Sequence, residues 1–148
     1  MQNSPSPKII YLLMSAEKQL QQWMKHNRPK DFPSPAQSGV LFLLGQNDGL
    51  LMGEIAQRLH LVPSAVSGLI QRMENEQWLS KQICTEDARA SRVYLLPKAK
   101  QLLPKLIQHT QQLNQQLLQD MSPHEIQAVE RWLNRVIHQF PSPSNTGK

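Results

Sequence analysis

The sequence of 148 residues contains a single cysteine, Cys84, so no disulfide can form within the chain. This cysteine usage is typical of a reducing compartment, and we expect a cytoplasmic location. Aromatic residues are also scarce, at 5% of the chain, although apolar residues make up 39%. The core must therefore consist mainly of aliphatic side chains, and the abundance of Leu and Gln favours a mostly helical protein of one domain.

Features that several other classes of protein need are missing. No run approaches about 18 apolar residues, so we predict no membrane-spanning helix. The first residues lack the basic segment and apolar stretch of a signal peptide. The histidines show neither i, i+4 pairs nor an association with the cysteine, which argues against a metal site. Because no nucleophile elbow, phosphate-binding loop or paired carboxylates occur, we expect neither an enzyme nor a bound cofactor.

The formal net charge of +5 is compatible with a polyanionic partner. The charge is unevenly distributed along the chain, however. Residues 53–92 contain five basic and five acidic side chains, whereas the basic excess lies in residues 8–30 and 97–108. Net charge alone is therefore weak evidence for a nucleic-acid partner.

Two helices are predicted in the first third of the chain. Apolar residues at helical spacing indicate the first over residues 8–26. The second begins after Ser34, which can cap it, with Pro35 at its first position and Gln37 completing a capping box. Residues 40–44 are five apolar residues in a row, so we expect this helix to be buried at the centre of the fold. A turn at 47–49 and a very short strand at 50–52 follow.

Two short helices, about 53–60 and 63–76, have the spacing of a helix-turn-helix. The apolar positions that define this spacing are Ile55, Ala56, Leu59, Leu61, Val66 and Leu69. Ala56 is small where the two helices would cross, and Val66 and Leu69 would point inward to lock the second helix. His60 stands in the turn where glycine is usual, and histidine tolerates the left-handed backbone that this turn requires.

A charged β-hairpin is predicted directly after the second short helix. Residues 78–84 and 92–95 have strand character, and the polar segment 85–91 would form the tip of the hairpin. A helix followed at once by such a hairpin is the plan of a winged helix, a common device for binding DNA.

Two further helices complete the predicted fold. Residues 97–119 carry a heptad-like seam of Ala99, Leu103, Leu106, Thr110, Leu113 and Leu117. Pro104 within this segment predicts a kink or a restart of the helix. The last helix opens at Ser122 with a capping box that Glu125 completes, and it continues to about residue 140. We expect residues 1–7 and 141–148 to be disordered tails.

Over residues 8–140 this order of elements resembles the MarR family of bacterial transcription regulators. Four positions match the family's wing motif, namely Asp87, Arg89, Val93 and Leu95. Ala88 replaces an arginine of that motif, and Leu96 and Ala99 replace its usual threonine and glycine. In the second short helix, Gly68 stands where the family commonly has a basic residue.

The resemblance implies a mainly α-helical fold with a small β wing. Residues 34–96 would form a winged helix-turn-helix DNA-binding lobe, and the helices at 8–26 and 97–140 a dimerisation region. The family further implies a homodimer that binds double-stranded DNA at a near-palindromic operator, as a repressor that responds to a small-molecule effector. Independently, the first and the last two helices carry more apolar surface than one winged helix can cover, which favours a partner chain.

The candidate DNA contacts lie on the outward face of the second short helix and at the wing tip. Serine, glutamine and arginine hydrogen-bond base edges or phosphates, alanine contacts a thymine methyl group, and glycine permits a close approach. The predicted helix contacts are Pro63, Ser64, Ala65, Ser67, Gly68, Gln71 and Arg72. Arg89 at the wing tip is the candidate for insertion into a minor groove. The alternative interpretation is an ordinary solvated polar face.

Three other residues of the wing have different expected roles. Asp87 and Arg92 are interpreted as a pair that holds the shape of the wing. Cys84 has no second cysteine with which to form a disulfide, so a small buried apolar residue is a simpler interpretation than a redox sensor. A protein-interaction module without sequence-specific DNA binding is the alternative function, which the neutral charge of residues 53–92 favours.

Overall fold

The computed structural model describes residues 8–140, so the tails predicted at 1–7 and 141–148 lie outside the described part of the chain. Its contacts divide the chain into two compact units, residues 1–38 and 39–148. In the first unit, α1 (Lys8–His26) has the predicted bounds. The capping box is confirmed as well, because the Ser34 N–H donates to Gln37 Oε1 at 2.8 Å and the Gln37 N–H donates to Ser34 Oγ at 3.3 Å. Helix α2 (Pro35–Gln46) starts at this box and runs into the second unit.

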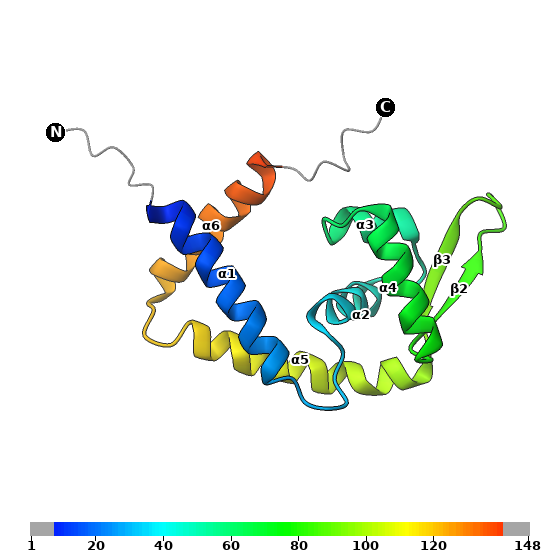
Figure 1. Ribbon diagram of the computed structural model, residues 1–148, viewed down its shortest axis with the longest axis horizontal. Coiled ribbons are helices and arrows are strands. Elements are labelled where there is room, and N and C mark those ends of the chain that lie inside the picture. The colour runs from blue at the N-terminus through cyan, green and yellow to red at the C-terminus, as the bar shows by residue number, and fades with distance from the viewer. Residues whose placement is uncertain (1–7, 141–148) are drawn as a thin grey trace. The chain divides into compact units, whose positions relative to one another are not determined.

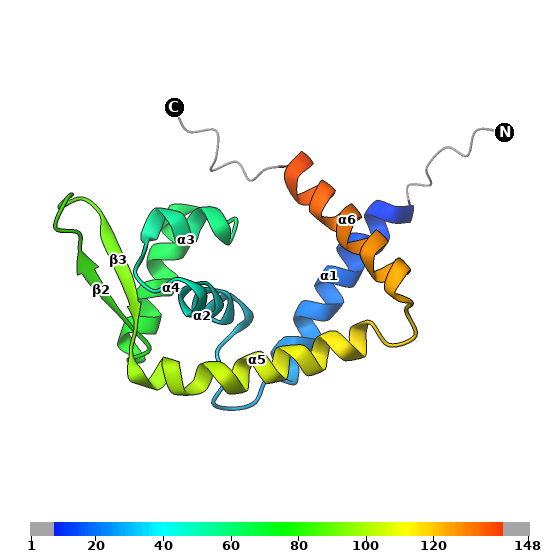
Figure 2. The same ribbon diagram turned by 180° about the vertical axis from the view of Figure 1, so that it is seen from behind.

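The second unit combines helices with one small antiparallel sheet, which confirms the predicted fold class. After α2 come β1 (Leu50–Leu51), α3 (Met52–Arg58), α4 (Pro63–Asn75), β2 (Leu79–Ile83), β3 (Ser91–Leu95), α5 (Pro97–Leu117) and α6 (Pro123–Gln139). The strand order is β1-β3-β2. Strands β2 and β3 form a long hairpin beside α4, and α5 starts at the base of that hairpin (Figures 1 and 2).

The core of the second unit lies where α2, α3 and α4 meet the sheet. Helix α2 contributes Val40, Leu41 and Leu44, each at most 1% exposed, so its predicted central position is confirmed. The other two residues of the apolar run 40–44, Phe42 and Leu43, are half-buried. The remaining core side chains are Leu50, Ile55, Ala56, Val66, Leu69, Ile70, Met73, Trp78, Leu79, Val93, Leu95, Ala99 and Leu106. As predicted, the core is almost entirely aliphatic.

Helix α5 is one continuous helix over 21 residues, with Pro104 inside it. The restart that we considered at this proline is therefore wrong. Ala99 and Leu106, on either side of the proline, are both buried. Their burial holds the two halves of the helix in place although the proline removes a backbone N–H donor. Along the predicted seam, burial decreases toward the C-terminal end, where Leu117 is 52% exposed.

Helix α6 begins at the predicted capping box. The Ser122 N–H donates to Glu125 Oε2 at 2.8 Å, and the Glu125 N–H donates to Ser122 Oγ at 3.3 Å. Its described residues include no buried side chain. Within residues 8–140, none of the helices is both long enough and apolar enough to cross a membrane.

Candidate nucleic-acid interface

Helices α3 and α4 are joined by a tight turn. His60 has a φ of 54°, so it adopts the left-handed backbone expected at this position. The Leu61 N–H donates to the Ala56 carbonyl at 3.0 Å and closes the turn. Ala56 is only 7% exposed, as its predicted place at the helix crossing requires. The two helices therefore meet with the geometry of a helix-turn-helix.

Helix α4 has one buried and one exposed face. Val66, Leu69, Ile70 and Met73 point into the core and are at most 4% exposed, as predicted. The opposite face holds the candidate contact residues. Exposed on it are Pro63, Ser64, Ala65, Ser67, Gln71 and Arg72, whereas Gly68 is half-buried. The structure thus brings all seven candidates of the helix onto one polar surface.

One hydrogen bond orders a side chain of this surface, because Gln71 Nε2 donates to Asn75 Oδ1 at 3.3 Å. Arg72 Nη1 lies 3.8 Å from the point where a β-carbon on Gly68 would be. A β-carbon at position 68 would therefore make only an ordinary van der Waals contact with the Arg72 guanidinium, and the packing within the chain does not itself require glycine there.

The C-terminal end of α4 is tied to the wing and to α5. Glu74 Oε1 accepts a hydrogen bond from the Lys81 backbone N–H of β2 at 2.9 Å. Lys98 Nζ donates to the Glu76 carbonyl at 2.7 Å and lies 5.4 Å from the centre of the Trp78 ring. These bonds connect α4 to the base of the hairpin, so the two elements present their side chains in a defined arrangement.

The wing tip is organised by Asp87. Its Oδ1 accepts a hydrogen bond from the Arg89 backbone N–H at 2.9 Å, and its carbonyl accepts one from the Ala90 N–H at 3.0 Å. The Cys84 N–H donates to the Ala90 carbonyl and closes the loop. The Arg89 side chain takes no part in these bonds and is exposed. The turn therefore holds the backbone of Arg89 and leaves its guanidinium accessible to a partner.

The predicted pairing of Asp87 with Arg92 is wrong. No ion pair joins these two residues in the part of the chain that the structure describes. Arg92 Nη1 instead donates to the Gly49 carbonyl at 2.9 Å. The two groups are close because Arg92 of β3 lies opposite Leu51 of β1, two residues after Gly49. Both residues stabilise the wing, but Asp87 does so within the tip and Arg92 at the base.

Cys84 is not a core residue, contrary to its simplest interpretation from the sequence. It is half-buried at the end of β2. The pKa of its thiol is lowered, chiefly by the backbone N–H groups of Glu86 and Asp87, which hydrogen-bond to the sulfur. The Arg92 guanidinium lowers the pKa further. The thiol therefore lies among hydrogen-bond donors, which favour its thiolate form.

An open depression of about 510 Å³ lies between α4 and the wing. Ser67 of α4, Lys81 of β2 and Arg89 of the wing tip all line it. Its other lining residues are Leu51, Met52, Gly53, Ala90 and Ser91. Lys81 thus shares a hollow with candidate residues from both elements. No acidic side chain lines the depression, so it suits a negatively charged partner.

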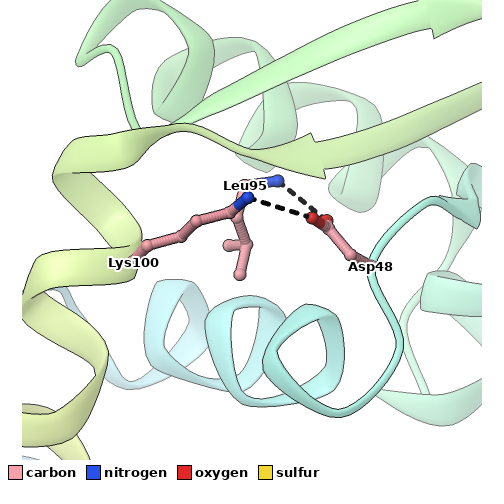
Figure 3. A network of polar contacts seen from close by, with 3 residues as sticks. All are labelled: Asp48, Leu95 and Lys100. Carbon is pink, nitrogen blue, oxygen red and sulfur yellow. Dashed lines mark hydrogen bonds and ion pairs between the residues drawn. The ribbon is translucent and has the colours of Figure 1, made fainter.

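The turn before β1 is a part of the site that sequence reasoning missed. We predicted residues 47–49 only as the turn that ends the preceding helix. In the structure, Asp48 Oδ1 accepts a hydrogen bond from the Leu95 backbone N–H at 2.9 Å, and Asp48 Oδ2 lies 3.8 Å from Lys100 Nζ (Figure 3). No local sequence pattern could have indicated these partners, because Asp48 and Leu95 are 47 residues apart.

A second hollow, of about 390 Å³, lies between α2 and α5. It is lined mainly by apolar groups together with amide and hydroxyl groups, from Phe42, Gly45, Gln46, Leu103, Ile107, Thr110 and Gln111. No charged residue lines it. Residues 8–140 contain no cluster of three or more His, Cys, Asp or Glu side chains able to hold a metal ion.

A helix-turn-helix beside a three-stranded sheet with an extended hairpin defines a winged helix-turn-helix protein. Residues 33–90, which span the second helix through most of the wing, match the family model of the MarR family. The chain belongs to the MarR family of transcription regulators. Family membership places it among DNA-binding regulators rather than enzymes.

Known relatives and solved structures agree with this assignment. The chain is 30% identical over 113 residues to the helix-turn-helix-type transcriptional regulator YfiV of Bacillus subtilis, covering 76% of this chain and 68% of that protein. It is 25% identical to a MarR family protein from Bacillus stearothermophilus, with 89% of each chain covered and a TM-score of 0.62. BpsR of Bordetella bronchiseptica shares the fold at 20% identity, with a TM-score of 0.78 over 87% of this chain and 98% of that one.

Proposed function

We propose that this protein is a homodimeric repressor that binds a near-palindromic operator and responds to a small-molecule effector. The observation that carries the proposal is the shared hollow between α4 and the wing, which Ser67, Lys81 and Arg89 all line. A DNA strand passing there would contact both elements at once. Such a regulator acts on DNA in the cytoplasm.

In this proposal α4 enters the major groove. Ser64, Ser67 and Gln71 offer hydroxyl and amide groups to base edges, and Arg72 offers a guanidinium, which pairs best with guanine. Ala65 is small and apolar, as contact with a thymine methyl group requires. Pro63 starts the helix, and Gly68, which has no side chain, permits a close approach of the helix backbone to DNA. Sequence specificity would arise on this face.

The wing supplies the second part of the binding. Arg89 extends from a turn that its own backbone N–H helps to hold, so only its side chain has to become ordered when the guanidinium enters a narrow minor groove. Lys81 lies beside the same hollow and would contact phosphate. Few basic groups are involved, so we expect a modest salt dependence of affinity compared with strongly basic DNA-binding proteins.

The homodimer rests on uncovered apolar side chains outside the winged helix. On α6 and at its C-cap, exposed apolar residues recur at helical spacing, namely Val129, Trp132, Leu133, Ile137 and Phe140. In the first unit, α1 exposes Ile9, Ile10, Tyr11, Leu12, Met14 and Trp23. A stripe of this kind on an amphipathic helix is normally covered by another chain. We therefore assign residues 8–26 and 97–140 to dimerisation and residues 34–96 to DNA binding.

The effector is proposed to bind in the hollow between α2 and α5. The DNA binding of BpsR is regulated by 6-hydroxynicotinic acid. In this chain the lining of the hollow is uncharged, with Gln46, Thr110 and Gln111 as its hydrogen-bonding groups. We therefore expect an uncharged and largely apolar effector with one or two polar groups. By binding one spacing of α2 and α5 more tightly than another, it would shift the protein toward a state with lower affinity for DNA.

Selection of bound duplexes from a random DNA pool tests the proposal. The full-length protein should enrich sequences with two related half-sites about 10 base pairs apart, because a symmetric dimer places one recognition helix in each. Failure to enrich any duplex at low salt would contradict the regulator and favour the alternative, a protein-interaction module.

Arg89→Ala tests the contribution of the wing on the selected duplex. We expect the affinity to fall about tenfold, since one inserted guanidinium is lost, while Tm stays unchanged because the bond from the backbone N–H to Asp87 remains. Fluorescence anisotropy gives the affinity and circular dichroism the Tm. Arg131→Ala on α6 is the charge-matched control and should leave the affinity nearly unchanged. An equal effect of the two substitutions would remove the wing from the mechanism.

A further inference from the structure

Asp48 joins three separate elements of the winged helix although it contacts none of the proposed DNA-binding side chains. It lies in the turn between α2 and β1. One of its carboxylate oxygens accepts the Leu95 N–H from the end of β3, and the other faces Lys100 in the first turns of α5 (Figure 3). The carboxylate thus connects the root of the wing to the turn after α2 and to the start of α5.

The register of the sheet explains why a carboxylate is needed at this point. Strand β1 pairs with β3 through Leu50 opposite Val93 and Leu51 opposite Arg92. Continuing this antiparallel register places Asp48 opposite Leu95, but Asp48 lies two residues before β1 begins at Leu50. The Leu95 N–H would then lack a strand partner on this edge, and the Asp48 side chain supplies the acceptor instead. The carboxylate extends the short β1–β3 ladder.

Neighbouring bonds hold the same turn against β3. The Gly49 N–H donates to the Val93 carbonyl at 3.0 Å, and the Gly49 carbonyl accepts from Arg92 Nη1 at 2.9 Å. A β-carbon on Gly49 would lie only 2.7 Å from Tyr94 Cε1, so the backbone of the turn is packed directly on the strand. Every residue of β3 from Arg92 to Leu95 therefore meets residue 48, 49, 50 or 51.

The two contacts of the Asp48 carboxylate differ in strength. The bond from the Leu95 N–H is short, half-buried and made to a charged acceptor. The pair with Lys100 is 3.8 Å long, and the Lys100 side chain is 60% exposed, so solvent screens it. The hydrogen bond to Leu95 must carry most of the effect, and the Lys100 pair adds little.

We propose that Asp48 is a positioning residue that sets the orientation of the wing and, through it, the contact of Arg89 with DNA. Strand β3 runs from Asp48's partner Leu95 to Ser91, next to the wing tip. A hinge at the base of a hairpin displaces its tip most, because the displacement grows with distance from the hinge. The inference rests on the proposed DNA binding by the wing.

The test uses the full-length protein and variants that separate the two contacts. Asp48→Ala removes both, Asp48→Asn keeps an oxygen acceptor for the Leu95 N–H without the charge, and Lys100→Gln removes only the ion pair. Asp31→Ala, at an exposed position in the first unit, is the charge-matched control. Removal of an acidic residue should slightly strengthen DNA binding by charge alone, so a loss of affinity in Asp48→Ala would run against simple electrostatics.

Affinity is measured on the duplex selected by the wild-type protein, at a temperature well below every Tm. We expect Asp48→Ala to bind about tenfold more weakly, and Asp48→Asn and Lys100→Gln to stay within about threefold of wild type. Because Asp48 acts through the wing, the double variant Asp48→Ala/Arg89→Ala should bind no more weakly than Arg89→Ala. Full additivity in this cycle, or wild-type affinity of Asp48→Ala, would overturn the proposal.

Amide hydrogen exchange without DNA separates this inference from the proposed function. The Leu95 amide should be protected in the wild type and in Asp48→Asn, and it should exchange faster in Asp48→Ala, with shifted amide resonances at residues 85–91. If the wild type selects no duplex, the proposed function fails, and these resonances alone decide whether Asp48 positions the wing. Unchanged exchange at Leu95 and unchanged resonances at 85–91 would overturn the role of Asp48 in either case.

Discussion

At the scale of single residues, Gly49 has both a left-handed backbone and a close neighbour over its α-carbon. Its φ of 82° lies in the left-handed region, and the Tyr94 ring leaves no space for a β-carbon. Gly53, four residues later, has no atom within 4 Å of a β-carbon position. The two glycines therefore form a matched pair in which only the first is required by the fold.

We predict that Gly49→Ala lowers the free energy of unfolding by on the order of 2–3 kcal/mol, from backbone strain and the clash with the ring. Gly53→Ala lies in α3, where alanine favours helix, and should change stability by no more than about 1 kcal/mol in the stabilising direction. Urea unfolding followed by circular dichroism measures both. Similar losses for the two variants would contradict the assigned role of Gly49.

Cys84 gives a second prediction at the residue scale. Its pKa is lowered mainly by the backbone N–H groups of Glu86 and Asp87, and the thiolate is the form that reacts with alkylating agents. The pH midpoint of its reaction with iodoacetamide should therefore be lower in the folded protein than in the urea-unfolded chain. Arg92→Ala should raise the folded midpoint only in part, because the guanidinium is a smaller cause than the backbone donors. Equal midpoints for folded and unfolded chains would refute the hydrogen-bonded thiolate.

At the scale of elements, the capping boxes before α2 and α6 differ in one chemical property. The box before α2 is completed by Gln37, whose amide does not ionise, and the box before α6 by Glu125, whose carboxylate does. The pKa of Glu125 is lowered from its ordinary value of 4.5, first by the backbone N–H of Ser122 and then by its hydroxyl. Of these two caps, only that of α6 should therefore respond to acid.

Because the pKa of Glu125 is lower in the folded than in the unfolded chain, its contribution to stability is present above about pH 4.5 and is lost as the pH falls through the folded value. We expect Glu125→Gln to lower Tm at about pH 7 and to have little effect at a pH below the folded pKa of Glu125, where the wild-type carboxyl is itself protonated. Gln37→Ala in the other box serves as the control, and its effect should be similar at both pH values. A pH-independent effect of Glu125→Gln would contradict the charged cap.

At the scale of the whole molecule, the apolar stripe of α6 predicts the association state. Light scattering after gel filtration should give twice the mass of one chain. Trp132→Glu places a charge within the stripe and should produce monomers, since burying an unpaired carboxylate in an interface is strongly unfavourable. Gln127→Glu, an exposed residue of the same helix outside the stripe, introduces the same charge and should leave the dimer intact. A wild-type protein that stays monomeric at micromolar concentration would refute the proposed dimerisation region.

The sequence by itself determined the features that depend on near neighbours along the chain. Helix starts at Ser34 and Ser122 were predictable because a capping box involves residues only three positions apart. The buried face of α4 followed from the spacing of Val66, Leu69 and Ile70, because helical periodicity assigns each residue to one side. The left-handed turn at His60 was also predictable from its place in the helix-turn-helix spacing.

Only the tertiary structure decided which distant groups meet. The sequence offered Asp87 as a partner for Arg92, yet Arg92 binds the Gly49 carbonyl, 43 residues away in the chain. Asp48 and Leu95 meet because the sheet register brings them opposite each other. Pro104 breaks a local helix rule, but the burial of Ala99 and Leu106 on either side keeps α5 continuous. Hydrogen bonds and core burial act through space, so a pattern read along the chain predicted the elements of this winged helix but not the contacts that hold its wing.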